Sequence, residues 1–257
     1  VCSSDLEALE SPAEFLILGG GDGTLSRSVG RLAGSGKVLG VLPLGTFNLA
    51  ARDLSLPLDP LKAAEELLRG EVGEIDILRV NEHCCLCATV FGFYPALAKK
   101  RESYHGQAWW LKSLRIAYEL AFVATKSRAL RMELRGGGER RQLKTRLAAF
   151  SPGRYEDEFG LIPRRKDLAA GELFAYISRG RSRWDLLREG CKFLLGKVFD
   201  PEEMVLMRGR ELELRVKGRR RLEAMIDGEI LEVNLPCRLR IEAKALRVLR
   251  VEGGDEG

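Results

Sequence analysis

The sequence predicts two domains in series, a parallel α/β domain followed by a β-rich antiparallel domain, with the boundary near residues 78–82. Two apolar runs, Phe15–Leu18 and Val38–Leu42, each end in a glycine-containing turn that opens a helix. Such strand–turn–helix units are typical of a parallel sheet, and we expect both strands to be buried in it. From Leu130 to Val251, short alternating runs such as Leu143–Phe150, separated by glycine-rich turns, are typical of an antiparallel sandwich or open barrel.

The turn after the first run reads Gly19-Gly20-Gly21-Asp22-Gly23-Thr24. A strand, a glycine turn and a helix present backbone N–H groups to a phosphate, and glycines allow positive φ and close approach of a ligand. No lysine follows, so the Walker pattern is absent, and the Rossmann spacing is met only in part. Asp22 would repel a phosphate unless it holds a cation, a ribose or a backbone amide. A tight turn without a ligand is the alternative.

The second run leads directly into Pro43-Leu44-Gly45-Thr46-Phe47-Asn48-Leu49-Ala50. Ligands of doubly wound sheets bind outside the carboxyl ends of the strands, so both turns are expected to converge on one polyphosphate.

Together the two motifs resemble the diacylglycerol kinase catalytic domain superfamily, and within it the bacterial lipid kinases and sphingosine kinases. NAD kinases share the first motif but usually not the second in this form. The resemblance implies an α/β nucleotide-binding domain of the NAD kinase and diacylglycerol kinase type over residues 1–80. It implies a β-rich substrate domain over residues 81–257, with a C-terminal segment able to pack back on the first domain. Residues 1–13 do not resemble the family's opening strand–helix unit, so we expect an N-terminally truncated nucleotide domain with an exposed sheet edge.

The implied function is an ATP-dependent lipid kinase that transfers the γ-phosphate of ATP to the hydroxyl of a diacylglycerol- or sphingoid-like lipid, with ATP and Mg²⁺ as cofactors. In the lipid kinases the glutamate of an Asp-Gly-Glu turn is the general base, which implies that role for Glu229 and a supporting role toward the metal or the loop for Asp227. Taken alone, Asp227-Gly228-Glu229 is an ordinary β-turn. The residues implied for cofactor binding are Gly19, Gly20, Gly21, Asp22, Gly23, Thr24, Gly45, Thr46 and Asn48.

Two departures from the family pattern limit this reading. Ala170 occupies the place of an aspartate that holds a structural magnesium in the family, and a methyl group is no ligand, so the metal-binding residues stay unassigned. Ala88 stands where the family often has asparagine. The alternatives are therefore an NAD kinase-like phosphotransferase and a non-catalytic nucleotide- or lipid-binding relative.

Further elements follow from local patterns. Residues 60–69 form a helix capped by Asp59, and Glu74–Val80 forms a strand whose partner is His83–Phe91. The intervening Asn81-Glu82 is a hairpin turn, although NAD kinases hold ribose with such a pair. Helices are expected at 108–125 and near 184–195; Trp109 and Trp110 in the former suit either a core or a membrane interface.

Composition narrows the class and location of the protein. The net charge of +5 comes with basic clusters at Arg164–Lys166, Arg179–Arg183 and Arg219–Arg221. Such clusters are typical of solvated turns or of electrostatic binding to anionic lipid. No aromatic residues are interleaved with these basic clusters, so they do not indicate binding of nucleic acid. Cys84, Cys85 and Cys87 suit buried strand positions better than a metal site. No transmembrane segment or signal peptide is visible, so we expect a cytoplasmic protein, peripheral at the membrane, and a homodimer stays open.

Overall fold

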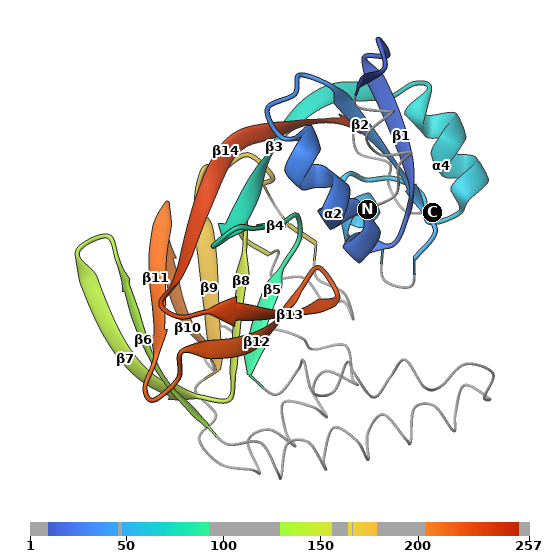
Figure 1. The fold of residues 1–257 in the computed structure, drawn as a ribbon. Coiled ribbons are helices and arrows are strands. Elements are labelled where there is room, and N and C mark those ends of the chain that lie inside the picture. Colours follow the sequence, from blue (N-terminus) through green and yellow to red (C-terminus); the bar gives the residue numbers. More distant parts are fainter. Residues whose placement is uncertain are drawn as a thin grey trace, which may run out of the picture.

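The computed structural model describes residues 10–45, 48–92, 129–155, 164–165, 167–178 and 204–251. Its strands form an eight-stranded mixed sheet and a separate six-stranded antiparallel sheet (Figure 1). The predicted fold class, a parallel α/β part followed by a β-rich sandwich, is confirmed. The division at residue 80 stays a prediction. The helices expected at 108–125 and near 184–195, with Trp109, Trp110 and the arginines at 179–183, lie outside the described residues.

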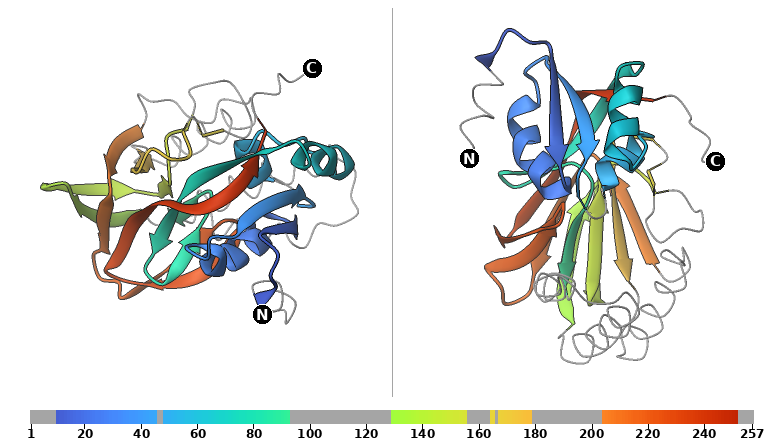
Figure 2. Two further views of the ribbon diagram at one scale, coloured as in Figure 1. Left: turned by 90° about the horizontal axis from the view of Figure 1, so that it is seen from above. Right: turned by 90° about the vertical axis from the view of Figure 1, so that its right-hand side faces the viewer.

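The α/β part is built on two parallel strands, β1 (Phe15–Gly20) and β2 (Val38–Pro43), paired from Phe15↔Val38 to Gly20↔Pro43. Helix α2 (Asp22–Leu32) and helix α4 (Pro60–Leu67) lie on opposite faces of these strands (Figure 2). The Asp59 carboxylate caps α4 by accepting 3.0 Å hydrogen bonds from the backbone N–H groups of residues 61 and 62, as predicted. The short α3 (Leu49–Asp53) follows the second glycine turn.

The expectation that the first strand is buried is wrong. Phe15 and Ile17 are 50% and 53% exposed, whereas most of β2 is buried. The reason is position: within the described part of the chain, β1 pairs with β2 alone and forms the edge of the sheet. The exposed sheet edge was predicted correctly.

The longest strand among the described residues, β14 (Cys237–Arg250), joins the two parts of the molecule. Along one side it pairs with β3 (Glu71–Val80) over almost its whole length. On the other side its first residues pair with β11 (Glu211–Val216), and Arg247 and Val248 pair in parallel with β2. The sheet continues from β11 through β6 (Leu130–Gly136) to β7 (Glu139–Thr145), and β4 (His83–Cys85) pairs with β3.

The six-stranded sheet packs against the sandwich half of the first sheet. Its order is β10 (Met204–Gly209), β9 (Leu173–Ser178), β8 (Leu147–Ser151), β5 (Thr89–Gly92), β12 (Arg221–Ile226) and β13 (Glu229–Asn234). One apolar core lies between the sheets, where the rings of Phe91 and Phe150 meet edge to face with their centroids 5.8 Å apart. A second apolar core lies under the helices.

Two predicted strands are each divided in the structure. The strand expected over residues 143–150 is the end of β7 and the whole of β8, separated at a turn where the Thr145 hydroxyl bonds Leu147. The strand expected over His83–Phe91 is β4 in one sheet and β5 in the other. It breaks because the N–H groups of residues 86–88 bind the Asp227 carboxylate instead of a neighbouring strand. The Asn81-Glu82 hairpin is confirmed by the pairing of Val80 with His83.

Candidate active site

The two glycine turns meet backbone to backbone, as their positions at neighbouring strand ends predicted. A Cβ atom on Gly45 would lie 2.5 Å from the Cα of Gly21, a distance that no side chain tolerates. The expected use of positive φ is wrong: none of the glycines at 19–23 and 45 has one. These glycines are needed for space, because each lets another part of the site approach the backbone closely.

The first turn leaves the N-terminus of α2 open. Gly21 is the N-cap residue and has no side chain to cap the helix, and the first intrahelical bond runs from Leu25 N–H to the Gly21 carbonyl. The N–H groups of residues 22–24 precede that bond and have no partner within the helix, and the helix dipole adds positive potential there. This arrangement fits a phosphate group.

Asp22 ties the two motifs together. Its Oδ1 accepts a 3.0 Å hydrogen bond from the Ala50 N–H at the start of α3. Burial raises the pKa of Asp22, and the hydrogen bonds from Ala50 and Leu49 partly offset that rise. The carboxylate therefore holds a backbone amide, one of the three partners that the sequence allowed; a role toward nucleotide or cation stays a prediction.

Asn48 shapes the second turn from within. It adopts a left-handed conformation (φ 51°), its amide donates to the Gly45 carbonyl at 3.0 Å, and its Oδ1 accepts from the Gly45 N–H at 2.8 Å. Both polar groups of the side chain are thus engaged in closing the turn. Thr46, which lies inside that turn, is outside the described residues.

Asp227 is buried and holds the loop between β4 and β5. Its carboxylate accepts hydrogen bonds from the N–H groups of Leu86, Cys87 and Ala88 at 2.6, 2.8 and 2.9 Å, and it is only 1% exposed. Burial, followed by the negative charge of Asp227, raises the pKa of Cys85 and of Cys87 well above the usual thiol value. The structure thus shows Asp227 bound to the loop between β4 and β5, and its expected supporting role toward the metal or the loop stays a prediction.

Glu229, the first residue of β13, reaches the first glycine turn from the far end of the sequence. Its Cγ lies 2.8 Å from the point where a Cβ on Gly23 would sit, so glycine at that position makes room for the acid. The Arg27 guanidinium, one turn further along α2, binds both carboxylate oxygens at 2.9 and 2.5 Å. The structure thus brings the predicted acid to the predicted phosphate cradle.

The segment around Ala170 is held by a buried side chain. The Asp76 carboxylate, 0% exposed, accepts from the N–H groups of Gly171 at 2.5 Å and Lys244 at 2.8 Å. Across the described ranges, no three histidine, cysteine or acidic side chains gather as a metal site.

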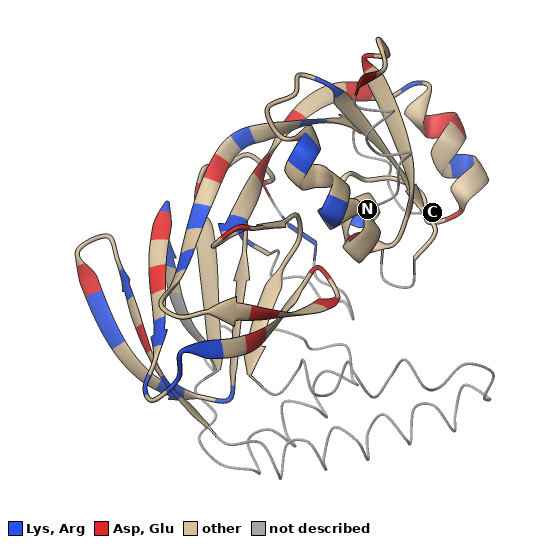
Figure 3. Ribbon diagram, in the orientation of Figure 1, with Lys and Arg blue, Asp and Glu red and all other residues tan. Residues whose placement is uncertain are grey.

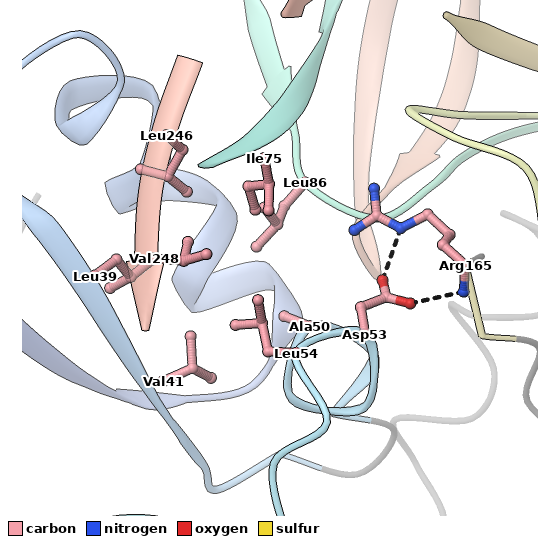
Figure 4. A pocket seen from close by; sticks show the side chains of 10 residues that line it. All are labelled: Leu39, Val41, Ala50, Asp53, Leu54, Ile75, Leu86, Arg165, Leu246 and Val248. Atoms are coloured by element: carbon pink, nitrogen blue, oxygen red, sulfur yellow. Dashed lines mark hydrogen bonds and ion pairs between the residues drawn. The ribbon is translucent and has the colours of Figure 1, made fainter. Parts of the chain in front are cut away.

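A second connection between the two parts was missed from the sequence. Asp53, the last residue of α3, accepts from the Nε and the backbone N–H of Arg165 at 2.8 and 3.0 Å (Figure 4). Arg165 is 3% exposed and also donates to the Pro152 carbonyl at 2.8 Å. The adjoining cavity of about 10 Å³ is at the lower limit for one water molecule. Reading Arg164–Lys166 as a solvated or lipid-facing cluster is therefore wrong at Arg165.

Comparison with known proteins identifies the relationship. Residues 6–80 match the diacylglycerol kinase catalytic domain. The recognition made from the two glycine motifs is confirmed, and the match ends where β3 ends. This segment contains both glycine turns but neither Asp227 nor Glu229.

Diacylglycerol kinase relatives are similar over different lengths. The enzyme of that name from Staphylococcus carnosus is 42% identical over 76 residues, which cover 29% of this chain and 25% of the relative. The one from Mycobacterium tuberculosis is 27% identical over 259 residues, covering 96% of this chain and 80% of the relative. A diacylglycerol kinase structure from Bacillus anthracis superposes with a TM-score of 0.73 at 18% identity, covering 97% of this chain and 82% of that one. This last likeness concerns the fold.

Proposed function

We propose that the protein is a lipid kinase that transfers the γ-phosphate of ATP to the hydroxyl of a diacylglycerol- or sphingoid-like lipid. The observation that carries this proposal is the position of Glu229 against Gly23, because it puts an acid beside an open helix N-terminus. Phosphoryl transfer to an alcohol needs both a phosphate cradle and a group that accepts the hydroxyl proton.

The residues divide the work as follows. The N–H groups at the start of α2 and the hydroxyl of Thr24 bind phosphate oxygens, with Thr46 as the counterpart from the second turn. Glu229 accepts the proton of the lipid hydroxyl. Asp227 fixes the turn that carries Glu229, and Asp22 fixes the second motif against the first. ATP supplies the phosphoryl group, and the Mg²⁺ that accompanies it would supply positive charge to its phosphate oxygens.

The test is transfer of labelled γ-phosphate from Mg-ATP into vesicles that contain diacylglycerol, monoacylglycerol, sphingosine, ceramide or undecaprenol. We expect a labelled lipid product from one class of acceptor. NAD serves as the competing acceptor: labelled NADP without labelled lipid, or binding of ATP with no transfer to any acceptor, would overturn the proposal.

We also propose that the protein works at an anionic membrane surface. None of the helices in the described part of the chain is long and apolar enough to cross a bilayer. Figure 3 shows basic segments gathered where β11 runs into β12. There Arg131 pairs across the sheet with Lys144 and its carbonyl accepts from the Lys217 N–H at 2.9 Å. These exposed side chains, with Arg219 and Arg220, have no ion-pair partner among the described residues.

Neutralising this patch is expected to weaken vesicle binding at least tenfold, since each basic residue near an anionic surface contributes roughly 1 kcal/mol. The variant is Arg131→Gln/Lys144→Gln/Lys217→Gln, measured by co-sedimentation with phosphatidylglycerol vesicles at low and high salt. The matched control is Arg31→Gln/Lys62→Gln/Arg69→Gln, which removes the same charge from α2, from α4 and from the turn that follows α4. Equal weakening in both variants would assign the effect to net charge and contradict a specific membrane face.

A further inference from the structure

Arg27 forms an ion pair with Glu229, the acid that the proposed reaction needs. Its Nε and Nη2 bind Oε2 and Oε1 of Glu229 at 2.9 and 2.5 Å, a two-pronged arrangement that engages both oxygens of the carboxylate. The hydrogen bond to Glu229, followed by its negative charge, raises the pKa of Arg27. The Arg27 side chain is 73% exposed and that of Glu229 26%, so the arginine can swing into solvent while the acid stays in place.

A second anionic partner for Arg27 would arrive with the nucleotide. Arg27 follows Gly23 by four residues on α2, so both lie on the same face of the helix, about 6 Å apart along its axis. A phosphate bound at the N-terminus of α2 would therefore lie within reach of the long arginine side chain. A guanidinium binds phosphate oxygens with the same two-pronged geometry that it offers to a carboxylate, and a polyphosphate carries more charge than one carboxylate.

We propose that Arg27 exchanges partners: it holds Glu229 in the nucleotide-free protein and transfers to the terminal phosphates when a nucleoside triphosphate binds. The exchange frees the oxygens of Glu229 only when the phosphate donor is in place. Arg27 is thereby a positioning residue that couples nucleotide binding to the availability of the acid. The inference rests on the proposed function, which supplies the identity of the polyphosphate.

The exchange predicts that the two side chains interact without nucleotide and lose that interaction when it binds. This is measured as ATP affinity, by calorimetry in lipid-free buffer, for the wild type, R27Q, E229Q and R27Q/E229Q. The effect of E229Q on ATP affinity is compared in two backgrounds, with arginine and with glutamine at residue 27. We expect the gain in affinity to be about two- to fivefold larger with Arg27, the range being that of exposed ion pairs. E229Q removes the simple repulsion between Glu229 and phosphate in both backgrounds, so this repulsion cancels when the two gains in affinity are compared.

Denaturant unfolding of the same four proteins without ATP tests the starting state. We expect the effects of R27Q and E229Q on stability to be non-additive there, and additive with saturating ATP. The matched control is R31Q, which removes an exposed arginine from the next turn of α2 and should leave ATP affinity unchanged.

The outcomes separate this inference from the proposed function. Additive ATP affinities across the four proteins would overturn the exchange and leave a lipid kinase standing. Additive stabilities without ATP would overturn it as well, because there would be no pair to release. A wild-type protein that binds no ATP would overturn both proposals.

Discussion

Replacing Glu229 with glutamine is expected to lower the rate of phosphoryl transfer about 10²- to 10⁴-fold, the range attributed to a positioned general base. Glutamine has nearly the same shape and fits the same space beside Gly23, but its amide cannot accept the hydroxyl proton. The measurement is the initial rate of labelled lipid formation at saturating Mg-ATP. ATP should still bind, because the N–H groups at the start of α2 are untouched.

The matched control for this variant lies on the same strand. Glu232 is an exposed glutamate of β13 that is also ion-paired with an arginine, Arg221, at 2.8 Å. Glu232→Gln therefore repeats the chemical change and the loss of an ion pair away from the glycine turn, and its rate should stay within about twofold of wild type, as for most surface substitutions. A fully active Glu229→Gln protein, or equal losses in both variants, would remove Glu229 from the role of base.

Replacing Arg165 with methionine is expected to lower the free energy of unfolding by about 3–5 kcal/mol, because it leaves the buried Asp53 carboxylate without its counter-ion. Burial lowers the pKa of Arg165, but the charge of Asp53, the neighbouring Cys87 and Tyr155 and the hydrogen bond to Asp53 together outweigh burial, and the pKa is raised. The Pro152 carbonyl also loses its donor. Urea unfolding followed by circular dichroism measures the change.

Two further variants make this result interpretable. Arg164→Met changes the neighbouring exposed arginine, which bonds the Ser55 hydroxyl, and should cost no more than about 0.5 kcal/mol. Arg165→Met/Asp53→Leu leaves no unpaired charge and should be more stable than Arg165→Met. If Arg165→Met proved as stable as Arg164→Met, the buried pair would not hold the two parts of the molecule together.

Local patterns in the sequence predicted the local elements of the fold. Both glycine turns, the Asp59 cap and the period-two strands were identified because side-chain periodicity and capping depend on residues a few positions apart. Errors arose where neighbours in space decide the outcome. Periodicity could not place β1 at a sheet edge, and it could not reveal that Asp227, far along the chain, would break the strand expected over residues 83–91.

The candidate site was predictable in parts. Motif resemblance singled out both glycine turns and Glu229, and the structure brings Glu229 to the first turn, where it pairs with Arg27, 202 residues away in the sequence. No sequence pattern indicated that Arg27 is the partner of Glu229. A helix predicted over residues 22–32 would have shown only that Arg27 lies on the same helix face as Gly23. Arg165 was misread because basic residues in a run are usually solvated, and its buried partner Asp53 lies 112 residues away.

The position of β14 between β2 and β11 has a consequence for synthesis of the protein on the ribosome. Until residues 237–250 have emerged, β2 and β11 each have an uncovered edge, and the core beneath the helices lacks Leu246, Val248 and Leu249. The nascent α/β part therefore has exposed edges that are open to other chains until a strand translated about 200 residues later has emerged. A chaperone that shields those edges during translation would act on this step.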